Sequence, residues 1–457
     1  MQIKKLLSIA MALTLSFGAV QTMGNISDVS FAAESEDANY IEGKCTLYDK
    51  KNHTLTVFGE VDKAELTQYR SGNNAGWIVE KIEASSSTVL PEDCNDLFAH
   101  FHDAKYIDIQ HVDSSKVTKM YAIFAYDYSA TVIHCPAYTG NVTDMGDMFA
   151  ACSNLKYVNV NLLDTSNVES MHDMFACCAK LEKLDLSNFD TSNVINMNGM
   201  FRDCSALKEL EIGSFDTSNV LGMENMFKGC SALETIHLNH FDTSKVVWMG
   251  EMFKDCRNLK WLDIKNFKTT SVIEMNSMFY DCKKLKELDL SSFTLSSELK
   301  SMEYMFAGCD NLETIKVNEN WTHDKVSNVM HTGGMFFGCV NLRGGYGTKY
   351  DPAYTGAQYA RIDTPAFKGY LTGPSVGGTE IGDTNNDGRV DATDASNILS
   401  KYAEYSTSGK TPTSDELAVY DVNGDGKINS VDASCVLSYY TYTQTGGTDS
   451  FADYMND

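Results

Sequence analysis

The chain has 457 residues, 43% of them hydrophobic, and this content excludes a wholly disordered protein. Its formal net charge of -25 argues against nucleic-acid binding, which requires clustered lysine and arginine side chains to neutralise phosphates. The sequence therefore predicts a folded, acidic protein with more than one domain.

Residues 1–32 have the layout of a secretory signal peptide. Lys4 and Lys5 precede an apolar stretch over residues 6–20, and the small side chain of Ala32 suits cleavage after that residue. A membrane anchor is the alternative, but the apolar stretch is shorter than the roughly 20 residues that cross a bilayer. We expect a secreted or cell-surface protein without a membrane span.

Between residues 97 and 343 a word of the type Met-Phe-x-x-Cys recurs about every 26 residues. Degenerate copies surround Phe101 and Phe124. Such a period predicts a solenoid, in which each repeat buries its apolar face against its neighbours. The cysteines that mark the repeats are Cys152, Cys178, Cys204, Cys230, Cys256, Cys282, Cys309 and Cys339.

Each repeat contains two predicted elements. Its first half has the pattern L-x-x-L-x-L, in which alternating leucines predict a short strand with one exposed face. Its second half has the apolar spacing of one helical face, for example at Val194, Met197, Met200 and Phe201. The D-T-S word before this face can cap a helix. The sequence therefore predicts a rung made of a strand, a turn and a short helix.

The full repeat L-x-x-L-x-L-x-x-F-D-T-S-N-V-x-x-M-x-x-M-F-x-x-C resembles the bacterial surface leucine-rich repeats called BspA-like, over residues 97–343. The resemblance implies an α/β solenoid of the leucine-rich-repeat type. Residues 33–96 resemble the β-rich N-terminal cap of that family, and residues 344–373 resemble its C-terminal cap. Both caps would shield the ends of the stack.

The recurring polar and sulfur residues have more than one interpretation. Cysteines stacked about 4.8 Å apart could form disulfides, but Phe101 replaces cysteine in one rung, and free buried thiols are favoured. Zinc would need paired cysteines in register, and Cys177 with Cys178 has no second pair. Met pairs such as Met171 with Met174 are favoured as core filling over a soft metal site. The aspartates of the D-T-S words are favoured as turn and cap residues over catalysis.

A short linker over residues 374–380 leads to two loops of twelve residues, DTNNDGRVDATD and DVNGDGKINSVD. A calcium loop needs oxygen ligands at positions one, three, five, seven, nine and twelve, with glycine at position six. Both loops meet this requirement, and a pair of ordinary Asp-Gly turns is the alternative. The predicted ligands are Asp383, Asn385, Asp387, Arg389 through its carbonyl, Asp391 and Asp394 in the first loop, and Asp421, Asn423, Asp425, Lys427, Asn429 and Asp432 in the second.

Each loop is followed by a similar apolar segment, and this duplicated unit resembles the type I dockerin of cellulosomes, over residues 381–447. The resemblance implies a small α-helical module with two EF-hand-like loops, two bound Ca²⁺ ions and a cohesin module of a scaffoldin as partner. In the family, positions ten and eleven of each loop contact the cohesin. Here those positions are Ala392, Thr393, Ser430 and Val431, and residues 448–457 are expected to be a tail.

Motifs of hydrolases, metalloproteases and phosphate-binding loops, such as H-E-x-x-H and G-x-S-x-G, are missing from the sequence, so it predicts no enzyme. Residues on the exposed strand face vary from rung to rung and are free to serve recognition. One patch of this face is predicted to bind a ligand, with scattered surface residues as the alternative. It comprises His237, Asn239, His240, Trp261 and Lys265.

We therefore expect a secreted, non-catalytic binding or scaffold protein. Its solenoid would recognise an extracellular protein or glycan, and its dockerin would attach it through a cohesin to a cellulosome-like or cell-surface complex. One alternative is an accessory component of polysaccharide degradation with glycan-binding or hydrolytic activity. Another is an adhesin for host or microbial surface proteins.

Overall fold

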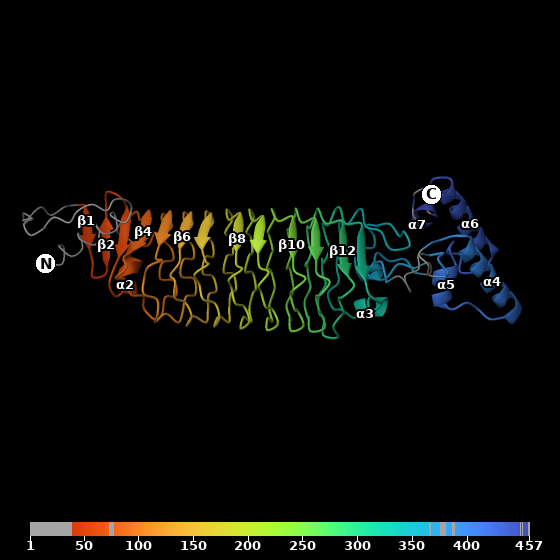
Figure 1. Cartoon of the computed structure of the whole chain (residues 1–457), viewed down its shortest axis with the longest axis horizontal. Helices are drawn as coiled ribbons and strands as arrows, with labels where there is room; N and C mark the ends of the chain where they lie inside the picture. Colours follow the sequence, from red (N-terminus) through yellow and green to blue (C-terminus); the bar gives the residue numbers. More distant parts are fainter. Residues whose placement is uncertain are drawn as a thin grey trace, which may run out of the picture.

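The computed structural model describes residues 39–72, 77–364, 367–374, 381–385, 389–447, 449 and 451–455. The predicted signal peptide, residues 1–32, lies outside these ranges. Figure 1 shows a long row of stacked rungs followed by a group of helices. The predicted leucine-rich-repeat solenoid and the separate helical module are thus confirmed.

In the N-terminal cap, three antiparallel strands join the parallel sheet of the solenoid. Strands β1 (Tyr40–Glu42), β2 (Thr46–Asp49) and β3 (Thr54–Val57) pair antiparallel. Helix α2 (Lys63–Leu66) and the 3-10 helix η1 (Thr67–Tyr69) follow, and β3 then pairs in parallel with β4 (Lys81–Ala84). The cap covers the apolar end of the first rung.

One strand per rung forms the exposed strand face. The first sheet has seven strands, β1 to β7, and the later strands form the pairs β8–β9, β10–β11 and β12–β13. The strands of the rungs are β5 (Tyr106–Asp108), β6 (Val132–His134), β7 (Tyr157–Asn159), β8 (Lys183–Asp185), β9 (Glu209–Glu211), β10 (Thr235–His237), β11 (Trp261–Asp263), β12 (Glu287–Leu290) and β13 (Thr314–Val317).

The second half of each rung differs from the predicted short helix. Residues 97–343, all of which the structure describes, contain one helix, α3 (His323–Ser327), and it lies outside the M-x-x-M-F words. In a typical rung the stretch is a series of tight turns, with Gly199 and Asp203 at φ of 62° and 59°. The N–H groups of Met197 and Gly199 donate to carbonyl oxygens of the next rung.

The physical reason for this difference is the width of a helix. An α-helix with its side chains is about 10 Å wide, whereas neighbouring strands lie about 4.8 Å apart. A helix in every rung would spread one side of the stack and bend it strongly. Stacked turns are as narrow as strands, and Figure 1 accordingly shows a row of rungs with little curvature.

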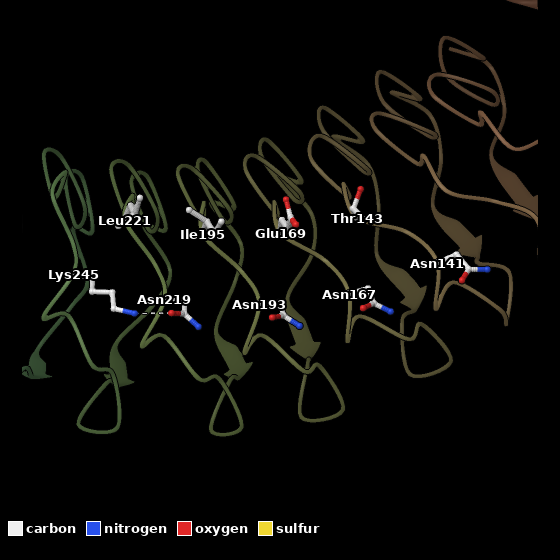
Figure 2. Close-up of a pocket in the computed structure, with 9 residues that line it drawn as sticks. All are labelled: Asn141, Thr143, Asn167, Glu169, Asn193, Ile195, Asn219, Leu221 and Lys245. Carbon is white, nitrogen blue, oxygen red and sulfur yellow. Dashed lines mark hydrogen bonds between the residues drawn. The ribbon is translucent and has the colours of Figure 1, made fainter.

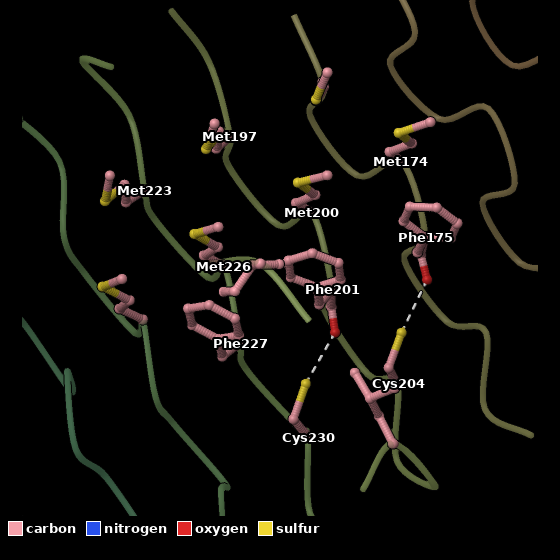
Figure 3. Close-up of a cluster of buried hydrophobic side chains, with 14 of the residues drawn as sticks. Met174, Phe175, Met197, Met200, Phe201, Cys204, Met223, Met226, Phe227 and Cys230 are labelled. Carbon is pink, nitrogen blue, oxygen red and sulfur yellow. Dashed lines mark hydrogen bonds between the residues drawn. The ribbon is translucent and has the colours of Figure 1, made fainter. Parts of the chain in front are cut away.

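Ladders of identical side chains fill the interior (Figure 3). The rings of Phe175, Phe201 and Phe227 stack with centroids 6.1 and 5.6 Å apart. The thiols of Cys204 and Cys230 each donate to the carbonyl oxygen of the phenylalanine one rung earlier, over 3.1 Å. All thirteen cysteines are free thiols in the structure, which agrees with the favoured interpretation of the ladder.

The D-T-S words hold successive rungs together. The carboxylate of Asp190 accepts hydrogen bonds from the N–H and hydroxyl groups of Ser192, which closes a turn. The buried hydroxyl of Thr165 donates to the carbonyl oxygen of Asp190 in the next rung over 2.9 Å and accepts its N–H over 2.9 Å. These residues therefore form turns and cross-links between rungs, and there is no helix at this place for them to cap.

Residues 344–373 close the stack. The N–H of Val317 in β13 donates to the carbonyl oxygen of Thr372, which adds a last bridge beside the sheet. The ring of Tyr370 is fully buried and meets Phe336, the last ring of the phenylalanine ladder, edge to face at 5.2 Å. The segment, which includes the 3-10 helix η2 (Ala357–Tyr359), thereby shields the final rung from water.

The C-terminal module has helices α4 (Ala392–Ser408), α5 (Ser414–Tyr420), α6 (Ser430–Gln444) and α7 (Phe451–Tyr454). Helices α4 and α6 follow the two loops and share one core, which includes Ile398 and Val436. The sequence predicts a tail over residues 448–457, but Phe451 is fully buried, with its ring 4.9 Å from that of Tyr439. Helix α7 is therefore part of this core.

Candidate metal sites and interaction surfaces

The first loop brings two buried aspartates, Asp383 and Asp394, to the start of α4. The carboxylate of Asp394 accepts the N–H of Thr384 over 2.7 Å and the N–H of Asp391 over 2.9 Å. These bonds tie the last position of the loop to its second and ninth positions. Among the predicted ligands, Asp387 lies outside the described residues.

The second loop has the same construction. The carboxylate of Asp432 accepts the N–H of Asn429 over 2.8 Å, and that of Asp421 accepts the N–H groups of Asp425 and Gly426 over 3.1 and 2.8 Å. Gly426 has a φ of 81°, the left-handed conformation that the sharp turn at position six requires. Burial raises the pKa of both Asp421 and Asp432 above the usual value of a carboxyl group.

The donor set fits calcium. Buried carboxylates are costly unless a positive charge compensates them, and a bound Ca²⁺ ion would supply such a charge in each loop. All side-chain ligands offered by both loops are oxygens, which Ca²⁺ prefers. The described residues hold no group of three or more His, Cys, Asp or Glu side chains that could hold a metal ion. Asparagine and backbone carbonyl oxygens supply part of the predicted ligands of both loops.

The predicted cohesin-contact residues lie on the surface of the module. Ala392 and Thr393 begin α4, Ser430 and Val431 begin α6, and all four are exposed. The side chain of Val431 is 52% exposed. The starts of both helices are therefore accessible to a partner.

The predicted ligand patch is brought together only in part. His237 and Trp261 lie on the paired strands β10 and β11, with ring centroids 5.5 Å apart, and Trp261 is 48% exposed. His240 instead contacts the carbonyl oxygen of Ile212 in the preceding rung over 3.0 Å, so its ring links two rungs. Asn239 and Lys265 are exposed after the same strands. The core of this patch is therefore the pair His237 and Trp261.

A row of aromatic residues lies on the first strands, and two of its members, Tyr106 and His134, are not predicted by the sequence analysis. The rings of Tyr106 and His134 meet at 5.5 Å, and those of His134 and Tyr157 at 6.0 Å, across β5, β6 and β7. Tyr157 borders a surface hollow of about 1380 Å³ that continues over β8 and β9. Aligning the degenerate first rungs on the strand positions would have found this row.

Comparison with protein families supports the two-part organisation. Residues 381–439 match the family described as "Dockerin type I domain". Residues 135–235 and 206–321 match "Mycoplasma protein of unknown function, DUF285", a family of BspA-type repeats. No curated protein matches the chain. The predicted combination of BspA-like repeats and a type I dockerin is confirmed, and a dockerin implies calcium binding and a cohesin partner.

Two solved structures are similar at low identity. A leucine-rich repeat protein from Eubacterium ventriosum is 15% identical, and the match covers 75% of this chain and 97% of that one, with a TM-score of 0.30. A leucine-rich cell surface protein from Faecalibacterium prausnitzii is 12% identical, with coverages of 64% and 98% and a TM-score of 0.24. Among the described residues, no helix is long and apolar enough to cross a bilayer.

Proposed function

We propose that this chain is a secreted, non-catalytic binding protein that its dockerin attaches, in the presence of calcium, to a cohesin of a cellulosome-like or cell-surface complex. The solenoid presents a ligand-binding surface to the surroundings. The observation that carries the proposal is the pair of twelve-residue loops, each closed by a buried aspartate. Two Ca²⁺ ions, one in each loop, would occupy them.

The buried loop carboxylates explain why calcium matters to the module. The carboxylates at the ends of each loop lie in the core at the start of α4 and α6, so their mutual repulsion opposes folding until a cation neutralises it. Metal binding then contributes to the folding free energy. The cohesin would meet Ala392 and Thr393 or Ser430 and Val431, which stand next to the closing aspartates.

The test uses the full chain and the substitutions Asp394→Ala and Asp432→Ala. Each removes the closing carboxylate of one loop, so titration calorimetry should show the loss of one calcium site per substitution. The double variant should no longer be captured by a panel of cohesins. Glu404→Ala is the matched control, because it removes a carboxylate of α4 that pairs with Lys401 outside the loops. Capture that survives both chelation and the double substitution would contradict the proposal.

Recognition by the strand face is the second part of the proposal. Trp261 is 48% exposed and lies against His237 of the adjacent strand, and tryptophan is enriched in protein interfaces. A surface protein of host or microbial origin is the partner class in the adhesin alternative, and a plant polysaccharide is the class in the accessory alternative. Binding screens with wild type and Trp261→Ala, against surface proteins and glycans, separate these alternatives.

A further inference from the structure

A groove of about 600 Å³ runs along the solenoid across five rungs, and none of its lining residues belongs to a strand (Figure 2). One wall is a ladder of asparagines that ends at a lysine. The other wall is a row of residues just beyond the D-T-S-N words. The two walls comprise Asn141, Asn167, Asn193, Asn219 and Lys245 on one side, and Thr143, Glu169, Ile195 and Leu221 on the other.

The asparagine amides are held in place by the scaffold. The Nδ2 groups of Asn167 and Asn193 each donate to a carbonyl oxygen of the preceding rung over 2.7 Å. Among the described residues, no donor reaches the Oδ1 atoms of Asn141, Asn167 or Asn193, whereas Lys245 donates to Oδ1 of Asn219 over 2.7 Å. The groove thus offers fixed hydrogen-bond acceptors, which lose little conformational entropy when a ligand binds.

The opposite wall is apolar at its centre, and the groove is nearly neutral. Ile195 and Leu221 are 41% and 38% exposed. Glu169 and Lys245 are the two charged residues among the nine that line the groove, on a chain with a net charge of -25. A charged ligand would find little complementarity here. A ligand with hydroxyl groups on one edge and C–H groups on its faces would satisfy both walls.

The spacing of the rungs distinguishes two kinds of extended chain. The amides recur once per rung, about 4.8 Å apart, whereas an extended peptide presents groups to one side at every second residue, about 6.7 Å apart. A peptide would therefore lose register within two rungs. A sugar ring in an extended, unbranched chain has a length close to one rung spacing. We propose that the groove binds a linear, uncharged glycan with one ring per rung.

This inference does not depend on the docking module, and its first test uses defined ligands. The full chain is titrated calorimetrically with uncharged β-linked glucan, xylan and mannan oligosaccharides, from the disaccharide to the octasaccharide. Affinity for at least one series should rise with length and level off near the five rungs of the groove. Chelation of calcium should leave it unchanged, which separates this site from the dockerin. Binding of none of the three series would overturn the proposal.

The second test removes the amide oxygens without removing the links between rungs. Ser271 stands at the position of the repeat that is equivalent to the asparagines of the groove. Its hydroxyl donates to the carbonyl oxygen of Ser244 over 3.0 Å, so a serine at this position preserves the link between rungs. Asn167→Ser with Asn193→Ser should weaken glycan binding by about 25-fold, about fivefold for each hydrogen bond. Asn258→Ser is the matched control, since its Nδ2 makes the equivalent bond to Ser231 outside the groove over 2.8 Å.

The control variant should bind within about twofold of wild type. Leu221→Glu, which places a charge on the apolar wall, should also weaken binding. An affinity that is unchanged in the double asparagine variant would place the glycan elsewhere and overturn the proposal. Polygalacturonate or an extended peptide that binds instead, with sensitivity to the same variants, would equally overturn it.

Discussion

Replacing Thr165 by valine should destabilise the solenoid far more than replacing it by serine. Thr165 is 2% exposed, and its hydroxyl makes two hydrogen bonds to the backbone of Asp190 in the next rung, each over 2.9 Å. Valine has nearly the same shape but can neither donate nor accept. The substitution therefore breaks both cross-links and leaves a backbone N–H and a carbonyl oxygen without their partner.

The magnitude follows from these two groups. A buried donor or acceptor left without a partner costs about 1–3 kcal/mol, so the loss of both partners in Thr165→Val should reduce the free energy of unfolding by about 2–6 kcal/mol. Thr165→Ser retains the hydroxyl and removes one methyl group, at a cost of about 1 kcal/mol. The free energy of unfolding of a typical domain is about 5–15 kcal/mol, so the difference between the two variants is a large part of it.

Tryptophan fluorescence during urea unfolding measures this difference. All four tryptophans, from Trp77 to Trp321, lie in the solenoid and its N-terminal cap, so their emission does not report on the dockerin. Calcium is kept in excess so that the dockerin stays folded. Equal losses for Thr165→Val and Thr165→Ser, or a loss below about 1 kcal/mol for valine, would refute the role assigned to the threonine ladder.

Phe227→Ala should cost about 3–5 kcal/mol in the same fluorescence assay, because its ring is fully buried in the stacked ladder. Burial raises the pKa of Cys204 to about 12, so alkylation followed by mass spectrometry should leave Cys204 unmodified in the folded protein while the partly exposed Cys435 reacts. Phe451→Ala should lower the melting temperature of the calcium-loaded dockerin in circular dichroism, since α7 completes its core. Trp261→Ala should leave the urea midpoint unchanged, and a shift would show that this residue serves the scaffold.

The repeat period predicted the buried positions well. A solenoid places equivalent residues of every rung in equivalent surroundings, so one good assignment extends along the stack. Phe201 and Cys204 are buried as the pattern required, and so are Phe227 and Cys230 one rung later. The dockerin was equally recognisable from the sequence, because ligand chemistry dictates residue types at fixed positions within a short segment, and residues 381–439 match that family.

The secondary structure of the second half of each rung was not predictable from apolar spacing alone. Stacked turns and a helix both return apolar side chains to the core after three and then four residues, so the same pattern fits either. A different signal was present: Gly, Asn or Asp stands at one or both of two fixed places in these words, for example Gly199, Asp203, Asn225 and Gly229. These residue types tolerate positive φ, and all four adopt it.

The two candidate surfaces of the solenoid differ in how their residues change along the stack, and this difference separates their roles. On the strand face one column changes from Glu209 through Thr235 to Trp261 across β9, β10 and β11, which suits a partner whose own surface does not repeat. In the groove four successive rungs keep asparagine, and the next offers Lys245, whose amine holds the amide oxygen of Asn219. A uniform ladder can make the same contact in every rung only with a ligand that repeats with the same period. The strand face and the groove are therefore suited to different classes of ligand, and one solenoid can hold both while the dockerin anchors it.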